Sequence, residues 1–218
     1  MSVGSDQRVR RYFEEVAGEF DAIYDHGGGL SQRVIHRVFR QGMYQRVART
    51  VQECGDVRGK GVLDVGCGSG RVSLALARRG ASVLGIDYSQ AMIEWATMYL
   101  SSADDGALDV EFRHGDFMDL HGERRYDITI ALGLFDYIEE PLPFLERMRE
   151  LTQGILIASY PARFVPQAPI RKVWLRTRGC PVYFYTAGEL SRLYSAAGIE
   201  DYQTIHVPAG YLVKATVR

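Results

Sequence analysis

The sequence predicts an α/β protein: a doubly wound, mostly parallel seven-stranded sheet with one antiparallel strand from a C-terminal hairpin, and an N-terminal helical cap. From residue 61 onward, short runs of β-forming residues alternate with helix-like stretches, and connections of this length are crossovers between parallel strands. The last two runs are separated only by residues 208–210, which are too few for a crossover. They must therefore form a hairpin that reverses one strand at or near the edge of the sheet.

Seven runs are expected to form the strands. They are residues 61–65, 81–87, 109–116, 126–133, 154–160, 202–207 and 211–217. The segments between the first five runs, and the segment before the sixth, contain residues that start or stop helices. Thr186 and Glu189 have the spacing of a capping box ahead of residues 190–198. The other signals are a glycine stop at Gly80, a serine cap at Ser89, and prolines suited to a first helical turn at Pro141 and Pro143.

Residues 1–59 have a different pattern and are expected to form a helical cap or lid. Two amphipathic stretches, residues 5–25 and 31–53, are typical of helices and are parted by the glycine-rich residues 26–29. Residues 60–218 are expected to form one α/β domain. Its insert at residues 161–186 is expected to cover the site at the ends of the strands.

Composition and charge exclude several classes of protein. A chain of 218 residues with 46% hydrophobic content can bury a full core as one domain, and a net charge of −1 gives no global field toward nucleic acid. No apolar stretch approaches the roughly 20 residues that span a bilayer, and the N-terminus has no hydrophobic signal core, which predicts a cytoplasmic protein. The three cysteines include no CxxC pair and predict neither disulfides nor a zinc site.

The stretch VLDVGCGSGR, residues 62–71, puts three glycines behind the first run, where an open parallel sheet binds ligands. A phosphate-binding P-loop needs a lysine after its glycines, and none follows here. A dinucleotide fingerprint that starts at Gly66 needs glycine where Arg71 stands, and Asp64 would put a charge beside the pyrophosphate. The remaining pattern, D-x-G-x-G-x-G, is similar to the first motif of the class I methyltransferases that use S-adenosylmethionine.

Three later strand ends agree with this resemblance, which implies S-adenosylmethionine as the cofactor. Asp87 ends the second run, where a carboxylate can accept hydrogen bonds from both ribose hydroxyls. The resemblance implies that Asp116 binds the adenine amino group with Phe117 beside the ring, and that Leu132 and Gly133 lie against the methionine portion. The cofactor-binding residues that it implies are Asp64, Gly66, Cys67, Gly68, Gly70, Asp87, Tyr88, Met92, Asp116, Phe117, Leu132 and Gly133.

The methyl acceptor is expected to bind between the end of the fourth run, the cap and the insert. Methyl transfer mainly requires that the protein align the acceptor with the methyl group, so a general base is needed only where the acceptor keeps its proton. Asp136 and Tyr137 follow the fourth run and are the candidate catalytic residues, because either could orient or deprotonate the acceptor. The N/D-P-P-[YF] signature of amino-group methylation is absent from residues 132–141.

Further acceptor contacts are expected from the cap and the insert. The start of the chain resembles the lid helix of small-molecule methyltransferases, which implies contacts by Tyr12 and Tyr24. The insert contains arginines and aromatic residues but no acid, among them Arg163, Arg171 and Trp174, and arginine suits a carboxylate or phosphate. This predicts an acceptor with an acidic group and an apolar body. The alternative is a surface basic helix with an aromatic underside.

These observations predict an S-adenosylmethionine-dependent methyltransferase that acts on a small molecule by O-methyl transfer, as a monomer or homodimer. One alternative is an RNA or protein methyltransferase, because the arginines and aromatic residues of the insert could bind nucleic acid. The other is a non-catalytic S-adenosylmethionine-binding subunit of a heterodimer. No His, Asp and Glu residues have metal-ligand spacing, so no metal is expected.

Overall fold

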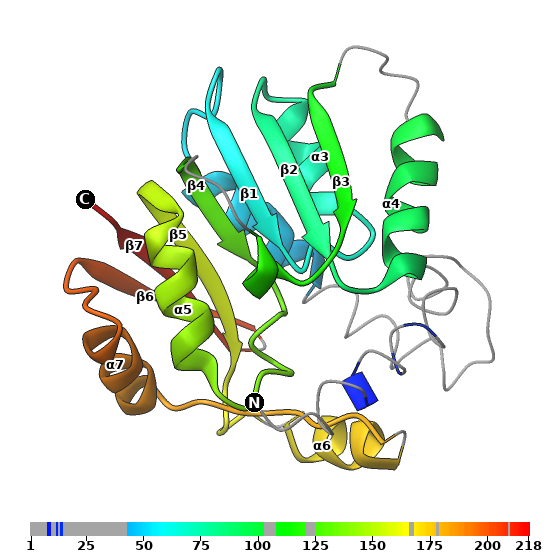
Figure 1. Cartoon of the computed structure of the whole chain (residues 1–218). Helices are drawn as coiled ribbons and strands as arrows, with labels where there is room; N and C mark the ends of the chain where they lie inside the picture. The colour runs from blue at the N-terminus through cyan, green and yellow to red at the C-terminus, as the bar shows by residue number, and fades with distance from the viewer. Residues whose placement is uncertain are drawn as a thin grey trace.

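Within the residues that the computed structural model describes, seven strands form one sheet (Figure 1). The described residues are Arg8, Val9, Tyr12, Glu14, 43–102, 108–120, 125–165, 168–177, 179–208 and 210–218. The strands are β1 (Gly61–Val65), β2 (Ser82–Asp87), β3 (Val110–His114), β4 (Tyr126–Ala131), β5 (Thr152–Pro161), β6 (Tyr202–Val207) and β7 (Gly210–Thr216). Their order is β3-β2-β1-β4-β5-β7-β6. The order reverses between β1 and β4, which is where open α/β sheets bind ligands.

Of these strands, β7 alone runs against the others. β1 pairs in parallel with β2 and β4, β2 pairs with β3, and β4 pairs with β5. β7 pairs antiparallel with both β5 and β6, because the connection between β6 and β7 is too short for a crossover. The predicted sheet and its hairpin are confirmed, and the reversed strand lies one position in from the edge.

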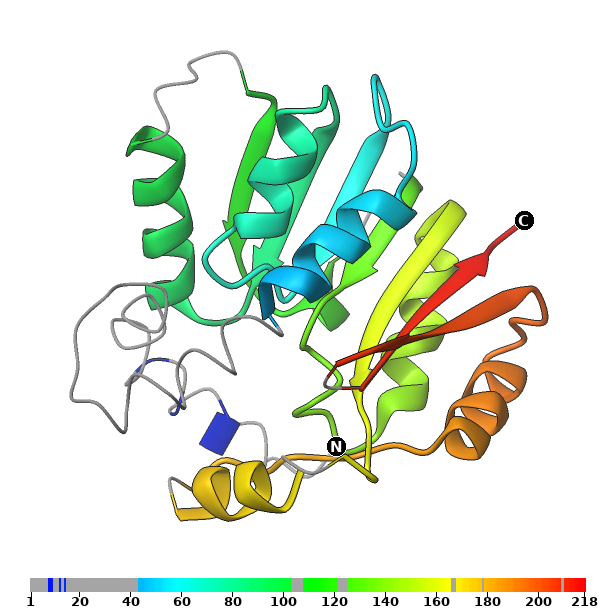
Figure 2. The same ribbon diagram turned by 180° about the vertical axis from the view of Figure 1, so that it is seen from behind.

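Helices cover both faces of the sheet (Figures 1 and 2). α5 (Pro141–Glu150) and α7 (Ala187–Ala196) pack on one face. α3 (Arg71–Ala77), α4 (Gln90–Ser102) and the helical residues 43–53 pack on the other. α6 (Ala168–Thr177), which belongs to the insert, lies beyond the carboxyl ends of the parallel strands. The insert thus reaches the edge of the sheet at which ligands bind in folds of this kind.

Local signals begin the helices as the sequence predicts. The backbone N–H of Met92 donates to Oγ of Ser89 at 3.4 Å, which satisfies one of the free donors in the first turn of α4. Thr186 and Glu189 form a reciprocal capping box at the start of α7. Pro141 is the first residue of α5, where its missing N–H is not needed.

β3 and β4 each end two residues earlier than predicted, and β5 is longer at both ends. β3 ends at His114, because the side chain of Asp116 accepts a hydrogen bond from the backbone N–H of Met118 and begins the short 3₁₀ helix η1 (Phe117–Asp119). β4 ends at Ala131, and Gly133 beyond it has a φ of 83°, which no strand residue adopts. Both differences bring predicted site residues into turns at the strand ends.

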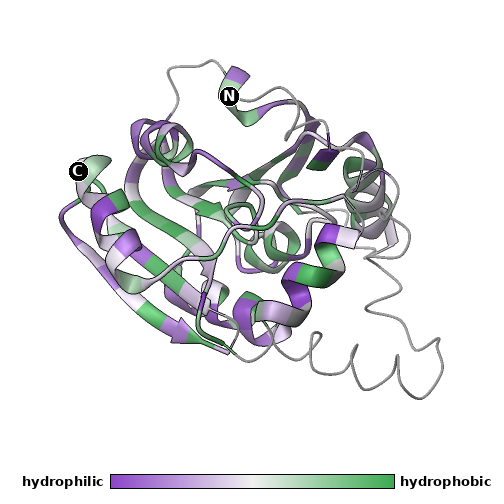
Figure 3. Ribbon diagram, turned by 90° about the horizontal axis from the view of Figure 1, so that it is seen from below, coloured by the Kyte–Doolittle hydropathy of each residue, from purple (hydrophilic) through white to green (hydrophobic). Residues whose placement is uncertain are grey.

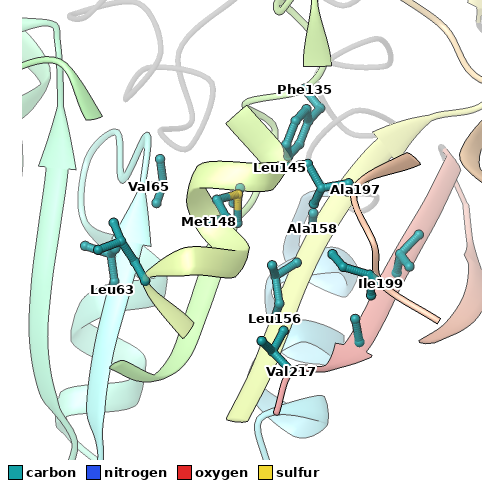
Figure 4. Close-up of a cluster of buried hydrophobic side chains, with 14 of the residues drawn as sticks. Leu63, Val65, Phe135, Leu145, Met148, Leu156, Ala158, Ala197, Ile199 and Val217 are labelled. Carbon is teal, nitrogen blue, oxygen red and sulfur yellow. The ribbon is translucent and has the colours of Figure 1, made fainter. Parts of the chain in front are cut away.

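The core consists of two layers of buried side chains, one on each face of the sheet. Leu63 of β1 and Leu156 of β5 pack with Met148 of α5 in the first layer (Figure 4). Val62 and Ile128 belong to the second layer, because successive residues of a strand point to opposite faces. Coloured by hydropathy, the middle of the sheet is mainly hydrophobic and the outer surfaces of the helices carry the hydrophilic residues (Figure 3).

The predicted cap is described only in part, and its division from residues 60–218 stays a prediction. Residues 43–53 are helical, and Val47 and Val51 pack against the second core layer. Val9 and Tyr12 are buried in a cluster with Leu175 of α6. The remaining residues of 1–42, apart from Arg8 and Glu14, lie outside the described part of the chain.

Two of the predictions made from composition concern disulfides and membrane-spanning segments. Cys54, Cys67 and Cys180 are free thiols. Among the described residues, no helix combines the length and the apolar character needed to cross a membrane.

Candidate functional site

A cavity of about 270 Å³ opens at the carboxyl ends of β1, β2, β3 and β4. The loop after β1, the ends of the neighbouring strands, the turn after β4, α6 and the helical residues 43–53 all contribute to its wall. Most of the predicted site residues meet there. They are Asp64, Gly66, Cys67, Gly68, Asp87, Tyr88, Met92, Asp116, Phe117, Leu132, Gly133, Asp136, Tyr137 and Arg171.

The glycine loop between β1 and α3 is fixed against the end of β2 by its backbone. The N–H groups of Gly66 and Cys67 both donate to the carbonyl oxygen of Ile86, at 2.8 and 3.1 Å. Gly66, Gly68 and Gly70 have φ values of 67°, 53° and 75°, a region that favours glycine. A Cβ on Gly68 would meet no atom within 4 Å, so the loop leaves open space there. A ligand can therefore approach the backbone closely at this point.

Asp87, the last residue of β2, holds the glycine loop and faces the cavity. Its Oδ2 accepts a hydrogen bond from the N–H of Gly68 and its Oδ1 accepts one from the N–H of Ser89, both at 2.9 Å. Burial raises the pKa of Asp87 above its ordinary value, while these backbone hydrogen bonds oppose the rise. Each oxygen keeps a further lone pair, so the carboxylate can accept two hydroxyl donors from a ligand.

Asp64 lies inside β1 beneath the glycine loop and is 2% exposed. Its Oδ2 accepts a hydrogen bond from Oγ of Ser73 in α3 at 2.6 Å. Burial raises the pKa of Asp64 from 3.8 to about 6, although the Ser73 hydrogen bond opposes this. Together with Asp87 it makes this end of the cavity unfavourable for phosphate. Among the described residues, no three or more His, Cys, Asp or Glu side chains group as metal ligands.

The raised pKa of Asp64 predicts a pH dependence of stability. Between pH 3.8 and about 6 the folded protein keeps a proton on Asp64 that the unfolded chain has released. The unfolded state then binds fewer protons, so the free energy of unfolding should fall with rising pH, by up to about 1.4 kcal/mol per pH unit. Asp64→Asn, which still accepts from Ser73, should lack this slope. Urea unfolding of both proteins from about pH 4 to about pH 8 measures the difference, and parallel curves would contradict the assignment.

The end of β3 adds an acid and an aromatic side chain to the cavity. The carboxylate of Asp116 is exposed and accepts a hydrogen bond from the N–H of Met118 at 2.8 Å. Phe117 is 4% exposed, and its ring centroid lies 6.2 Å from that of Phe144 in α5. This part of the wall therefore combines a hydrogen-bond acceptor with an apolar surface suited to a flat ring.

The turn after β4 lies beside a cationic side chain of the predicted cap in the cavity wall. The N–H of Gly133 donates to Oγ of Ser159 in β5 at 2.8 Å, and this hydrogen bond fixes the turn. Arg46, in the helical residues 43–53, has its Nη2 3.8 Å from the position of a Cβ on Gly133. A guanidinium group thus lies beside the glycine in the cavity wall.

Asp136 and Tyr137 follow the same turn and meet Arg171 of α6. Nη2 of Arg171 donates to Oδ2 of Asp136 at 2.5 Å and to the hydroxyl of Tyr137 at 3.4 Å. Asp136 is 1% exposed. Burial raises the pKa of Tyr137, so its hydroxyl keeps its proton near neutral pH. Of the two candidate catalytic residues, Asp136 is therefore the better suited to accept a proton.

The other predicted residues have different positions or lie outside the described part. Gly70 caps α3 next to the cavity without lining it. Tyr12 is buried against α6 and is also absent from the described cavity wall. Arg163 does not line the cavity, because its guanidinium donates to Oε1 of Glu189 at 2.8 Å on the surface. Tyr24 and the side chain of Trp174 lie outside the described residues.

Several residues of the cavity wall were not predicted. Arg46 carried no motif, and only the packing of the helical residues 43–53 on the sheet brings it to the site. Phe144 occupies the first turn of α5, behind the prolines that were interpreted only as a helix start. Ile138 extends the turn that contains Asp136. Both Ile138 and Phe144 are apolar residues that follow the fourth predicted strand, before or within the first turn of the next helix.

Comparison with known sequences identifies the domain. Residues 62–153 match a family model described as a methyltransferase domain. A ubiquinone biosynthesis O-methyltransferase from Azorhizobium caulinodans is 33% identical over 156 residues, which cover 66% of this chain and 60% of that protein. A protein of the same description from Acinetobacter baylyi is 31% identical over 104 residues, which cover 47% of this chain and 43% of that protein. The chain thus spans less than two thirds of the length of these curated relatives.

Comparison with solved structures extends the match over the whole fold. The magnesium protoporphyrin IX methyltransferase from Synechocystis PCC 6803, solved with bound SAH, has a TM-score of 0.78 with 24% sequence identity. The match covers 98% of this chain and 100% of that one, and it shows that the two share a fold. The family model, in contrast, matches the amino-acid sequence, over residues 62–153. Residues 62–153 therefore match a methyltransferase domain, and the whole chain shares its fold with a methyltransferase of known structure.

Proposed function

We propose that this protein transfers a methyl group from S-adenosylmethionine to a small-molecule acceptor, at an oxygen atom. The observation that carries the proposal is the junction of the glycine loop with Asp87 at the ends of two neighbouring strands. There the carboxylate holds the backbone of Gly68 and keeps a lone pair on each oxygen for a diol. The fit to a ribose without a phosphate is good, because two buried carboxyls, Asp64 and Asp87, disfavour a pyrophosphate.

The rest of the cavity wall fits the remaining parts of this cofactor. The exposed carboxylate of Asp116 has spare acceptor capacity for an adenine amino group, and Phe117 provides an apolar surface for the ring. Leu132 and Gly133 suit the methionine portion, as the resemblance implies. Arg46 adds a guanidinium beside Gly133, which suits the carboxylate of that portion.

The chemistry of methyl transfer assigns a limited task to the protein. When bound, S-adenosylmethionine supplies an electrophilic methyl group on a sulfonium. The chain has to orient the acceptor oxygen toward it and exclude water. The turn of residues 132–138 and Arg171 of α6 border the same cavity as the glycine loop, so they are in position for this task.

Calorimetric titration of the purified protein with S-adenosylmethionine, S-adenosylhomocysteine and NADH tests the proposal. We expect micromolar affinity for the first two ligands and none for NADH, since the wall offers two acids in place of a phosphate site. Tight binding of NADH, or failure of both sulfur ligands to bind, would overturn the proposed function.

Three finer predictions about the acceptor and the setting stay open. An acidic group on the acceptor remains a prediction from the basic insert, but Arg171 and Arg163 each already pair with a carboxylate of this chain. The near-neutral charge still disfavours nucleic acid as the substrate. A cytoplasmic location and a monomeric or homodimeric state likewise stay predictions of the sequence.

A further inference from the structure

The two carboxylate oxygens of Asp136 have different environments. Oδ2 is held by Nη2 of Arg171 at 2.5 Å. Oδ1 is fully buried and has no hydrogen-bond partner among the described residues. Asp136 lines the cavity and is 1% exposed, so solvent does not compensate for the missing partner. A buried carboxylate oxygen without a donor is unfavourable unless a ligand supplies one.

Asp136 is also held rigidly, so its free oxygen is a fixed feature of the cavity. Its carbonyl oxygen accepts a hydrogen bond from the N–H of Tyr183 at 2.8 Å. Arg171 reaches it from α6 and also contacts the hydroxyl of Tyr137. Two segments of the insert, one with Arg171 and one with Tyr183, therefore hold the turn after β4 in place. Asp136 lines the cavity, and Oδ1 is its one carboxylate oxygen that no described residue holds.

The chemistry of Oδ1 restricts the group that can meet it. A carboxylate oxygen accepts hydrogen bonds and donates none, so a carboxylate on the acceptor would be repelled at this point. The pair of Asp136 and Arg171 is neutral as a whole and offers no net charge to hold an ammonium group. A hydroxyl supplies the missing donor and carries an oxygen lone pair that can attack a methyl group.

We propose that Oδ1 of Asp136 accepts the hydrogen bond of the acceptor hydroxyl, and that the site therefore takes hydroxylated acceptors rather than carboxylates at the reacting position. The inference rests on the proposed function. As the acceptor oxygen bonds to the methyl carbon, the carbon–sulfur bond breaks with its electron pair on sulfur, and the hydroxyl proton passes to Oδ1. The sulfonium and the Asp136 carboxylate both become neutral, so charge is balanced.

Matched fragments test this before any natural acceptor is known. Phenol, 2-naphthol and cyclohexanol are compared with their methyl ethers and with benzoate, 2-naphthoate and cyclohexanecarboxylate. Binding is measured by ligand-observed NMR on protein saturated with S-adenosylhomocysteine. We expect at least one hydroxylated fragment to bind about tenfold more tightly than its ether and its carboxylate. Asp136→Asn should remove this preference, because the amide brings a donor and no charge.

Controls separate the possible failures. Asp119→Asn makes the same chemical change on an exposed acid outside the cavity wall and should keep the preference. Because Asp136→Asn leaves the Arg171 guanidinium without its carboxylate, Asp136→Asn/Arg171→Gln replaces the whole pair and should lose the preference while still binding S-adenosylhomocysteine. If S-adenosylhomocysteine fails to bind the native protein, the proposed function fails. If it binds and no hydroxylated fragment is preferred, or Asp136→Asn retains the preference, the inference alone is wrong.

Discussion

Asp87→Ala should lower the affinity for S-adenosylmethionine and S-adenosylhomocysteine by about a hundredfold or more. Two hydroxyl hydrogen bonds to a charged acceptor are lost, each contributing about 1.5–3 kcal/mol. The glycine loop also loses the anchor at the N–H of Gly68. Calorimetric titration of both ligands measures the change directly.

Stability should change much less than affinity in this variant. Burial raises the pKa of Asp87, which means that the folded state gains little from its charge. The substitution removes the acceptors of the Gly68 and Ser89 N–H groups, which lowers the free energy of unfolding. Removing a buried acid partly offsets this decrease. Asp119→Ala, an exposed acid outside the cavity wall, is the matched control and should bind both ligands like the native protein. Native-like affinity in folded Asp87→Ala would show that this carboxylate does not bind the cofactor.

Gly70→Ala should lower the free energy of unfolding by about 2–5 kcal/mol. Gly70 has a φ of 75°, and a Cβ there would lie 2.5 Å from Cζ of Phe112 and 3.1 Å from Cβ of Ala96. The same ring also lies 2.8 Å from the position of a Cβ on Gly85, so Phe112 packs against both glycines. Urea unfolding followed by circular dichroism gives the difference.

Gly68→Ala is the matched control for this prediction. Gly68 has a similarly positive φ of 53°, but a Cβ on it would meet nothing within 4 Å. Its cost should be limited to the left-handed backbone, about 1–2 kcal/mol. Equal losses in the two variants would mean that Phe112 moves aside freely and that the packing beneath the loop does not require glycine at position 70.

The fold and the cofactor side of the candidate site could be predicted because both depend on short-range patterns. Alternating strand and helix runs fix a parallel sheet, and a two-residue link between β6 and β7 forces a hairpin whatever the rest of the chain does. Asp64 is the second-to-last residue of its strand run, and Asp87 and Asp116 end theirs. Parallel strands bring their carboxyl ends to one edge, so counting strand ends was enough to predict that these acids share a cavity.

The acceptor side could not be predicted in the same way. Arg163 and Arg171 belong to one basic insert, and the sequence gives them the same role. In the structure Arg163 pairs with Glu189 at the surface, whereas Arg171 pairs with Asp136 inside the cavity. Each partner is distant along the chain, and the two arginines lie on different segments, Arg163 just after β5 and Arg171 in α6.

By itself, the sequence determined the alternation of strands and helices, the hairpin, the glycine loop and the three acids at or next to the strand ends, because local periodicity and backbone constraints act within a few residues. Only the tertiary structure decided that Arg46 reaches Gly133, that Phe112 fills the space that glycine leaves at positions 70 and 85, and that Asp136 of the cavity wall has one oxygen without a partner among the described residues. These features depend on how separate elements pack together. Side-chain partners at long range follow from that packing, and no pattern within one segment encodes them.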